Sequence, residues 1–274
     1  MKKIGYQGTK GSYSHQASLD LFPQAKHLGF VSFDALTDAL RDGAIDMAVM
    51  PIANSTAGRV SGSHNLIYEK DLYITDEYFL AVKHCLIANK TTCRQDIKRV
   101  FSHPQALSQC SEFIHKNGLE QVVWSDTAES VKHLTEQNSK HGAAIASELA
   151  AQIYGCKILK RNIQNKKDNT TRFVVLSRSK KICVKRDGVI TSIFYITKNI
   201  PAALYKSLGG FATEGINLIT IESFVPMKRN GKARFYLEFE GNPKDEKVKR
   251  ALAELEFYAE EMRVLGSYIE RKHR

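Results

Sequence analysis

The sequence predicts an α/β protein built in two parts, a larger open sheet with crossover helices and a smaller C-terminal unit. Across the first ~180 residues, short apolar runs alternate with amphipathic helical segments, which is typical of an α/β sheet. From about residue 186 the predicted order becomes strand, helix, strand, strand, helix, strand, which indicates a ferredoxin-like βαββαβ sandwich. A chain of 274 residues is long enough to give each part its own core.

Local signals place the elements of the first part. Short apolar runs predict strands at 4–6, 47–51, 73–82, 100–101, 122–124 and 143–146. Helices are predicted at 33–40, 104–117, after 126, and at 150–154. Gly43 lies where the helix at 33–40 needs a C-terminal cap. Pro104 opens the helix at 104–117, because a missing N–H costs nothing at the first helical position. Asp126, with Glu129 three residues later, forms a capping pattern for the helix that follows it.

The C-terminal part has its own alternation. Strands are predicted at 190–195, 217–226, 234–240 and 264–268, and helices at 201–214 and 248–258. An Asn-Gly pair within 228–231 predicts a hairpin turn between the two middle strands. A basic, weakly apolar stretch at 178–187 separates the two parts. We therefore expect one domain over 1–180 and a second over 186–274.

The charge of the chain limits the classes of partner. Lys and Arg number 40 against 29 Asp and Glu, which gives a net charge of +11 and a pI near 9.3. Such a charge suits nucleic acid, a membrane surface or a small anionic substrate. The basic residues are scattered, however, without interleaved aromatic residues and without a zinc-finger or RNA-binding signature. We therefore expect no nucleic-acid partner.

Cysteine usage and the N-terminus predict a cytoplasmic protein. The five cysteines are odd in number and widely spaced, with no CxxC, which favours reduced thiols over a disulfide framework or a zinc site. The N-terminus enters a strand without an apolar signal segment, and no stretch is long enough to span a bilayer. We expect no membrane partner. The spacing of His15, His64 and His84 indicates no metal site.

The most informative stretch is 169–173, Asn-Thr-Thr-Arg-Phe. It ends a polar, basic run and leads directly into the apolar run 174–176. Thr171 and Arg172 therefore stand where a loop becomes a strand. We expect them to present a neutral hydrogen-bond donor and a fixed positive charge, side by side, to a small anion. Three common residues mean little alone, so the prediction depends on the polar clusters upstream.

The first of these clusters, 8–15, follows the first strand and opens the first helix. Its glycines let backbone approach a ligand, and the helix N-terminus offers free N–H groups to an anion. The spacing is not that of a dinucleotide fingerprint. The alternative is a plain strand–helix turn in which Ser12 acts only as the cap.

Two further clusters stand at strand ends. In 51–58, Asn54 offers a neutral donor where open α/β sheets place ligands; the alternative is a turn that satisfies its own backbone. In 102–109, Gln105 and Gln109 lie one helical turn apart, so both amides point the same way. A capped surface helix explains that cluster equally well. Their shared position at strand ends and helix starts favours one anion-binding cleft.

Taken in order, these clusters resemble those of bacterial prephenate dehydratases. The matching pieces lie at 8–18, 51–60, 102–110, 125–130, 143–155 and 162–173. The C-terminal part is similar to the ACT regulatory domain of that family at 199–218 and 221–226. The likeness covers almost the whole chain, and six motifs in register make chance implausible.

The resemblance implies a cytoplasmic enzyme that converts prephenate to phenylpyruvate by decarboxylative dehydration, in phenylalanine biosynthesis, without a cofactor or a metal. It implies a two-lobed catalytic domain like periplasmic binding proteins, with the second lobe at about 78–160. It also implies a ferredoxin-like ACT domain that binds L-phenylalanine as a feedback inhibitor. Such domains would pair subunits into a homodimer or homotetramer.

The resemblance also assigns residues to roles. A threonine hydroxyl is a weak acid, so Thr171 would give a preorganised hydrogen bond to the departing hydroxyl. The other catalytic positions are Asn54, Ser102 and Gln109. The substrate-binding positions are Arg172, Phe173, Ser12, Tyr13, Ser14, Ser55 and Gln105. The effector-binding positions are Pro201, Ala202, Ala203, Leu204, Asn217, Leu218, Glu222 and Ser223.

The chain departs from the family pattern at three places. Ala53 replaces the usual glutamate, and we expect this to reduce activity or change its pH dependence. The stretch 222–226 replaces ESRP, lacks the arginine and is one residue longer. The usual GAL reads Ala-Ala-Leu at 202–204, and the added methyl would narrow an effector pocket.

Two other functions fit the same residues. An arogenate dehydratase would act on the aminated analogue of prephenate, and the sequence does not separate the two substrates. A non-catalytic amino-acid sensor would use the cleft and the ACT domain only to bind ligands. Ala53 favours the sensor, whereas the Thr171 hydroxyl favours an enzyme.

Overall fold

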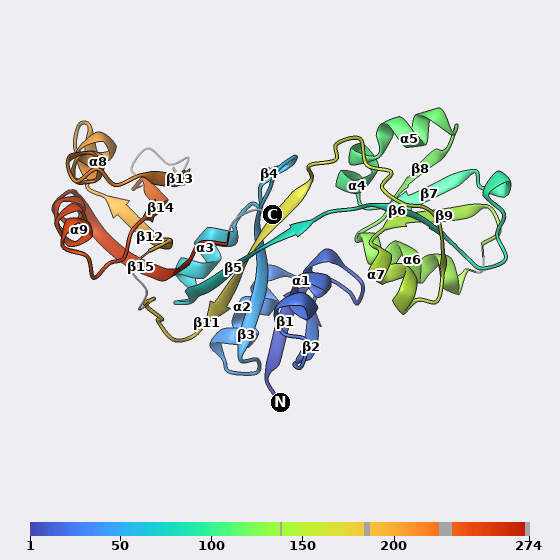
Figure 1. The fold of residues 1–274 in the computed structure, drawn as a ribbon, viewed down its shortest axis with the longest axis horizontal. Helices are drawn as coiled ribbons and strands as arrows, with labels where there is room; N and C mark the ends of the chain where they lie inside the picture. The colour runs from blue at the N-terminus through green and yellow to red at the C-terminus, as the bar shows by residue number, and fades with distance from the viewer. Residues whose placement is uncertain (138, 184–186, 225–231, 272–274) are drawn as a thin grey trace. The chain divides into compact units, whose positions relative to one another are not determined.

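The computed structural model describes residues 1–137, 139–183, 187–224 and 232–271 (Figure 1). The chain divides into two compact units. One comprises Met1–Ser63 and Tyr78–Phe173, and the other comprises His64–Glu77 and Val174–Arg274. The division falls inside two strands, β5 (Tyr73–Ala81) and β11 (Thr170–Ser177). The domain limits 1–180 and 186–274 remain predictions, because a compact unit is not by itself a unit that folds alone.

The first sheet includes three N-terminal strands that pair in parallel. In spatial order it contains β2 (Lys26–Phe30), β1 (Lys3–Gln7), β3 (Met47–Asn54), β11 and β5, with β4 (Gly58–Arg59) paired to β3. Parallel pairing of β1 with β2 and β3 requires crossovers, which α1 (Tyr13–Leu21) and α2 (Phe33–Arg41) supply. Ile4, Val49 and Phe173 pack with α1 in one apolar cluster, so β1, β3 and β11 are held together.

The second sheet also lies in the first unit. Its strands in spatial order are β10 (Lys157–Lys160), β6 (Cys85–Ala88), β9 (Gly142–Ala146), β7 (Arg99–Ser102) and β8 (Glu120–Val123). Its helices are α4 (Pro104–Gln109), α5 (Ser111–Lys116), α6 (Thr127–Glu136) and α7 (Glu148–Ile153). Ala143 and Ile145 pack with α4 and α5, whereas Ala144 and Ala146 pack with α6 and α7. Helices therefore cover both faces, which explains why β9 is buried throughout.

The C-terminal sheet is antiparallel. Its spatial order is β13 (Leu218–Phe224), β14 (Arg234–Glu240), β12 (Val189–Thr197) and β15 (Ala259–Ile269), with helices α8 (Ala203–Thr213) and α9 (Glu246–Tyr258). The chain order is βαββαβ, as predicted. Tyr195, Leu237 and Phe239 pack against Phe211 of α8 and Leu255 of α9. The helix α3 (Ser63–Glu69) belongs almost wholly to this unit.

The predicted fold class, an α/β protein with two lobes and a ferredoxin-like part, is confirmed. The single helix predicted at 104–117 is wrong, because Cys110 leaves helical geometry at φ −114° and ψ 15° and separates α4 from α5. The sequence did not indicate β2, β4, α3, β6 or β10. The turn at 228–231 and the end of the 222–226 motif lie outside the described residues.

Among the described residues, no helix has the length and apolar character needed to cross a bilayer. Across the same part of the chain, no three or more His, Cys, Asp or Glu side chains are grouped so as to hold a metal ion.

Candidate active site

Side chains from both sheets of the first unit line a cavity of about 340 Å³. Apolar and neutral polar groups alternate around it, and no Lys, Arg, Asp or Glu is among its described lining residues. The structure brings together seven of the side chains predicted for the site, namely Tyr13, Ser14, Asn54, Gln105, Gln109, Thr171 and Phe173. Residues separated by more than a hundred positions in sequence therefore share one cavity.

Several helices begin at this cavity. Tyr13 opens α1, Phe33 opens α2 and Thr127 opens α6, and each of these residues lines it. His103, which caps α4, lines it as well. The first N–H groups of a helix have no partner within the helix and carry partial positive charge. Backbone dipoles at these helix starts favour an anion in the cavity, and no ammonium or guanidinium group is among its described lining residues.

The helix starts are set by local side-chain caps. Ser12 Oγ accepts from His15 N at 3.2 Å. Asp126 Oδ1 accepts from Ala128 N at 2.8 Å and from Glu129 N at 3.0 Å, which confirms the predicted capping pattern. Ser12 does not line the cavity, so its role in substrate binding stays a prediction.

Thr171 and Asn54 meet at the adjacent ends of β11 and β3. Asn54 Nδ2 donates to Thr171 Oγ1 at 2.9 Å and to Asn169 Oδ1 at 2.8 Å. The threonine oxygen is therefore the acceptor in its contact with Asn54. Its own hydrogen is left for a partner in the cavity, which Thr171 lines.

The orientation of the Asn54 amide is set by backbone. Asn54 Oδ1 accepts from the N–H groups of Thr56 and Ala57 at 3.0 and 2.9 Å. An N–H group can only donate, so the oxygen must face the turn and the nitrogen must face Thr171. The turn interpretation of Asn54 is confirmed for its oxygen, whereas its nitrogen donates to Thr171 and Asn169, so donation to a ligand stays a prediction.

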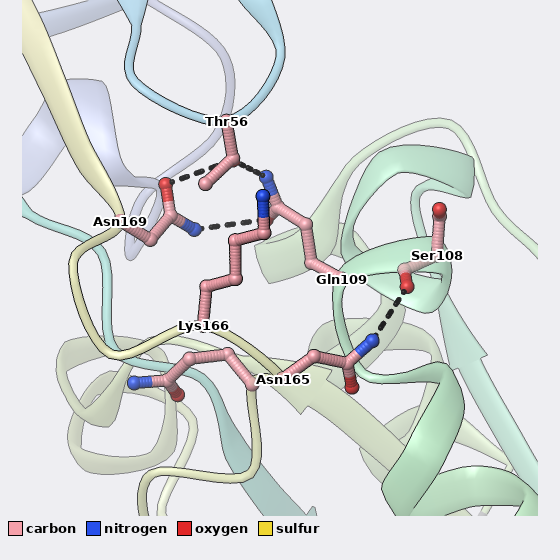
Figure 2. Close-up of a pocket in the computed structure, with 7 residues that line it drawn as sticks. Thr56, Ser108, Gln109, Asn165, Lys166 and Asn169 are labelled. Atoms are coloured by element: carbon pink, nitrogen blue, oxygen red, sulfur yellow. Dashed lines mark hydrogen bonds between the residues drawn. The ribbon is translucent and has the colours of Figure 1, made fainter.

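Gln109 connects the second sheet to these residues. Its Nε2 donates to Thr56 Oγ1 at 2.7 Å, and its Oε1 accepts from Asn169 Nδ2 at 3.1 Å (Figure 2). Thr56 Oγ1 in turn lies 2.7 Å from Asn54 Oδ1. Figure 2 shows Thr56, Gln109 and Asn169 as part of the wall of a second, polar pocket of about 180 Å³. One set of side chains thus separates two cavities.

His84 is buried beside Gln109. Its Nε2 lies 3.0 Å from Gln109 Oε1, and its Nδ1 lies 2.9 Å from the hydroxyl of Tyr13. Burial lowers the pKa of His84, and the contact with Gln109 opposes this only in part, so the imidazole is neutral. Burial also raises the pKa of Tyr13 well above its usual range, which keeps the phenol protonated.

The expected juxtaposition of Thr171 and Arg172 is absent. The strand β11 already begins at Thr170, so successive side chains point to opposite faces. Thr171 and Phe173 line the cavity, whereas the Arg172 guanidinium lies 5.9 Å from the centre of the Phe79 ring. The sequence pattern was interpreted as a loop that leads into a strand. Because Thr171 and Arg172 are instead consecutive residues of the strand, their side chains lie on opposite faces. Binding of substrate by Arg172 stays a prediction.

Two predicted serines do not line the cavity. Ser102 is fully buried and its Oγ donates to Ile145 O at 2.6 Å, which links β7 to β9. Ser55 Oγ donates to Asp168 O and accepts from Thr170 N at 2.9 Å, which supports the start of β11. Neither lines the cavity, and both predicted roles remain untested.

Comparison with known proteins identifies the family of this chain. A family profile described as "Prephenate dehydratase" matches residues 4–181. The chain belongs to the prephenate dehydratase family. It is therefore a carbon–oxygen lyase of phenylalanine biosynthesis.

Relatives match along nearly the whole chain. The arogenate dehydratase/prephenate dehydratase 2 of Arabidopsis thaliana is 38% identical over 97% of this chain and 72% of its own length. A bifunctional N-acyl-homoserine lactone acylase/prephenate dehydratase of Komagataeibacter europaeus is 36% identical over 97% of this chain and 95% of its own. The structure of a prephenate dehydratase from Arthrobacter aurescens in complex with L-Phe is 28% identical, with a TM-score of 0.91 over 98% of this chain and 90% of that one.

The predicted effector residues lie in the C-terminal unit, around the start of α8 and along β13. Ala202 precedes α8 and has a φ of +59°, which is a left-handed backbone conformation. Glycine, the residue expected at this position in the family, adopts that conformation without strain. Asn217 Nδ2 donates to Glu240 Oε1 at 2.9 Å. Glu222 Oε2 lies 3.1 Å from Nδ1 of the buried His64. The remaining effector positions are Pro201, Ala203, Leu204, Leu218 and Ser223, and binding at any of them is untested.

Sequence reasoning missed three side chains that hydrogen-bond with Gln109, namely Thr56, Asn169 and His84. Thr56 stands within the 51–58 cluster and Asn169 within the matched stretch 162–173, so both were in view without a role. His84 was considered only as a metal ligand. It belongs to no polar cluster, and only the crossover from β5 to β6 brings it to Gln109.

Proposed function

We propose that the protein dehydrates prephenate in the 340 Å³ cavity, with Thr171 as hydrogen-bond donor to the departing hydroxyl. In this reaction the bond between the ring and its carboxylate breaks and releases carbon dioxide. The electron pair passes through the ring, the opposite carbon–oxygen bond breaks, and hydroxide leaves with its negative charge. Aromatisation supplies the driving force. The products are phenylpyruvate, carbon dioxide and hydroxide.

The contact between Asn54 Nδ2 and Thr171 Oγ1, 2.9 Å long, is the observation that carries this proposal. Donation by Asn54 leaves the threonine O–H for the leaving group and polarises it toward donation. A preorganised donor of this kind is worth roughly 10²–10³ in rate. Walls formed by Phe33, Val82 and Phe173 would exclude water and strengthen that hydrogen bond.

The starts of α1, α2 and α6 would hold the two carboxylates of prephenate. Each is a helix of nine or more residues whose first residue lines the cavity, so the positive end of its dipole lies beside the cavity. Binding by N–H groups suits the reaction, because the ring carboxylate must lose its negative charge when it leaves as carbon dioxide. Neutral donors stabilise that charge less than an ion pair with Lys or Arg would, so they oppose its loss less. The net charge of +11 would add long-range attraction for the dianion.

Turnover of prephenate by the purified protein tests the proposal, with phenylpyruvate followed by its absorbance in alkali. We expect Thr171→Ala to lower kcat by about 100-fold or more with an unchanged Tm, and Thr171→Ser to retain much of the activity. Thr135→Ala is the matched control, because its hydroxyl donates to Lys132 O outside the cavity. Wild-type turnover by Thr171→Ala would remove Thr171 from the mechanism. Binding of prephenate without any turnover by the wild type would favour the sensor.

Arogenate is the second candidate substrate, because several relatives at 34–38% identity are named arogenate dehydratases. Arogenate carries an ammonium group where prephenate has a carbonyl. Among the described lining residues, the cavity offers no carboxylate to pair with that ammonium. We therefore expect prephenate to be preferred. Comparison of kcat/KM for the two compounds decides between them, and a higher value for arogenate would reverse the assignment.

The C-terminal unit would act as an ACT domain that binds L-phenylalanine and pairs subunits. Its βαββαβ order supports this, as does the related structure in complex with L-Phe. Among the described residues, β13 lies at the edge of its sheet with Ile219 and Ile221 exposed, which suits pairing with a second subunit. Calorimetric titration with L-phenylalanine, with D-phenylalanine as control, tests binding. Sedimentation of wild type and Ile221→Glu distinguishes a dimer or tetramer from a monomer.

A further inference from the structure

The hydrogen bonds around Asn54 close into a ring of four side chains that all donate in the same sense. Asn54 Nδ2 donates to Asn169 Oδ1, and Asn169 Nδ2 donates to Gln109 Oε1. Gln109 Nε2 donates to Thr56 Oγ1, and Thr56 Oγ1 donates to Asn54 Oδ1. The four distances lie between 2.7 and 3.1 Å. The second hydrogen of Asn54 Nδ2 leaves the ring and reaches Thr171.

The sense of the ring is fixed independently at its Asn54 corner. Two backbone N–H groups point at Asn54 Oδ1, and these cannot be reversed. Thr56 has a single hydroxyl hydrogen, for which Asn54 Oδ1 at 2.7 Å is the nearer acceptor and Asn169 Oδ1 at 3.3 Å the farther. Both are oxygens that accept, so the Thr56 oxygen must accept from Gln109. Gln109 must therefore turn its nitrogen toward Thr56 and its oxygen toward Asn169.

The Gln109 corner is the only one that comes from the second sheet, and it has no backbone N–H group to orient it among the described contacts. Its oxygen faces His84 Nε2 at 3.0 Å. A carbonyl oxygen only accepts, so Nε2 must carry a hydrogen. A bare Nε2 would instead attract the amide nitrogen of Gln109, turn the amide over and set it against Thr56 and Asn169.

Tyr13 faces the other nitrogen of His84. The imidazole is neutral and holds one hydrogen, so protonation of Nε2 leaves Nδ1 as an acceptor. The Tyr13 hydroxyl, 2.9 Å from Nδ1, is then the donor in this contact. Lys83 O, 3.0 Å from the same hydroxyl, competes for its one hydrogen. If His84 gained a proton, Tyr13 would turn to donate to Lys83 O, and Nε2 would still donate to Gln109.

We propose that Tyr13 and His84 are positioning residues that hold Gln109 in the orientation required to close the ring that orients Asn54 and Thr171. The effect on turnover rests on the proposed role of Thr171, but the tautomer does not. Without Tyr13, His84 could carry its hydrogen on Nδ1, and its bare Nε2 would then oppose the direction that Thr56 sets for Gln109. Tyr13 and His84 would thus orient the Gln109 amide, at the end of α4, toward its hydrogen-bonding partners Thr56 and Asn169.

Nitrogen-15 NMR of histidine-labelled protein tests the tautomer without any substrate. We expect the His84 signals, assigned by their loss in His84→Asn, to show hydrogen on Nε2 in the wild type and a mixture of tautomers in Tyr13→Phe. Tyr78→Phe is the matched control, because its hydroxyl donates to Asp20 instead. Hydrogen on Nδ1 in the wild type, or an unchanged tautomer in Tyr13→Phe, would overturn the proposal.

Kinetics test the consequence. We expect Tyr13→Phe and His84→Asn each to lower kcat about tenfold, the effect of one ordinary hydrogen bond, with a smaller change in KM. His84→Gln, which keeps an N–H donor at the ε position, should recover most of the loss. Equal losses in His84→Gln and His84→Asn, with unchanged Tm, would contradict a positioning role. If Thr171→Ala retains full activity while the NMR result holds, the proposed function fails and the tautomer lock stands.

Discussion

The hydrogen-bond ring of the first unit and the polar cluster of the C-terminal sheet are built on opposite plans. In the ring every side chain both donates and accepts, and none carries a charge. In the C-terminal cluster, donors converge on one buried carboxylate oxygen, Glu238 Oε1, from Tyr236, Tyr268 and Ser192 at 2.6, 2.9 and 3.2 Å. A convergent cluster uses up its hydrogens at one acceptor, whereas the ring passes one on to Thr171. We infer that the cluster stabilises the fold and the ring serves the reaction.

Reversing a donor in the ring should have the largest effect. Asn54→Asp keeps the shape of the side chain but replaces its nitrogen by an acceptor, so Thr171 would give its hydrogen to the introduced carboxylate. We expect kcat to fall by about 10²–10³, measured at saturating prephenate. Asn165→Asp adds the same charge at an exposed position whose amide donates to Ser111 Oγ, and serves as control. Equal turnover in the two variants would show that the ring, like the C-terminal cluster, has no role in the reaction.

Removing the acceptor of the cluster should change stability and leave turnover alone. Glu238→Ala leaves three buried hydroxyl groups without their shared partner, and we expect the free energy of unfolding in urea to fall by about 3 kcal/mol. Turnover below the transition should stay within about twofold, well under the tenfold change that one hydrogen bond is worth. Glu240→Ala, on the same strand but exposed, is the control. A large loss of kcat with little loss of stability would assign the cluster a functional role.

Acid should weaken the first unit, because its buried imidazoles are neutral. Burial, with smaller contributions from His27 and Lys10, lowers the pKa of His15 to about 4. Between that value and the unfolded value of about 6.5, the unfolded chain binds a proton that the folded chain does not. Stability is therefore fully present above pH 6.5 and is lost as the pH falls toward 4. Screening at the partly hydrated ring limits this contribution to about 2 kcal/mol.

Urea unfolding at pH 7 and pH 5 measures this effect. His15 Nδ1 accepts from Gly11 N at 3.0 Å, so His15→Asn keeps an acceptor that does not titrate. We expect that variant to lose less stability than the wild type over the same pH range. His27 and His84, whose pKa values burial also lowers, contribute in the same direction. An identical pH dependence in wild type and variant would show that His15 is not the group that titrates.

Much of the fold was predictable because its signals are local. Gly43 and Gly118 follow helices with φ of +80° and +61°, as a C-terminal stop requires. Strands such as β2 escaped prediction because the residues of Lys26–Phe30 are exposed or only partly buried and show no alternating pattern. The break at Cys110 escaped because cysteine and its neighbours have no strong preference against a helix. Prediction failed where the tertiary contacts outweighed local preference.

The sequence by itself determined which polar groups stand at strand ends and helix starts, because caps, turns and alternation act over a few residues. It placed Asn54, Gln109 and Thr171 in one site, and it indicated an anion as ligand. Only the tertiary structure decided that Arg172 faces away from Thr171, that Thr56 and Asn169 complete a ring, and that His84 lies against Gln109. The direction of a hydrogen bond depends on both partners, and these partners meet only when two sheets pack together.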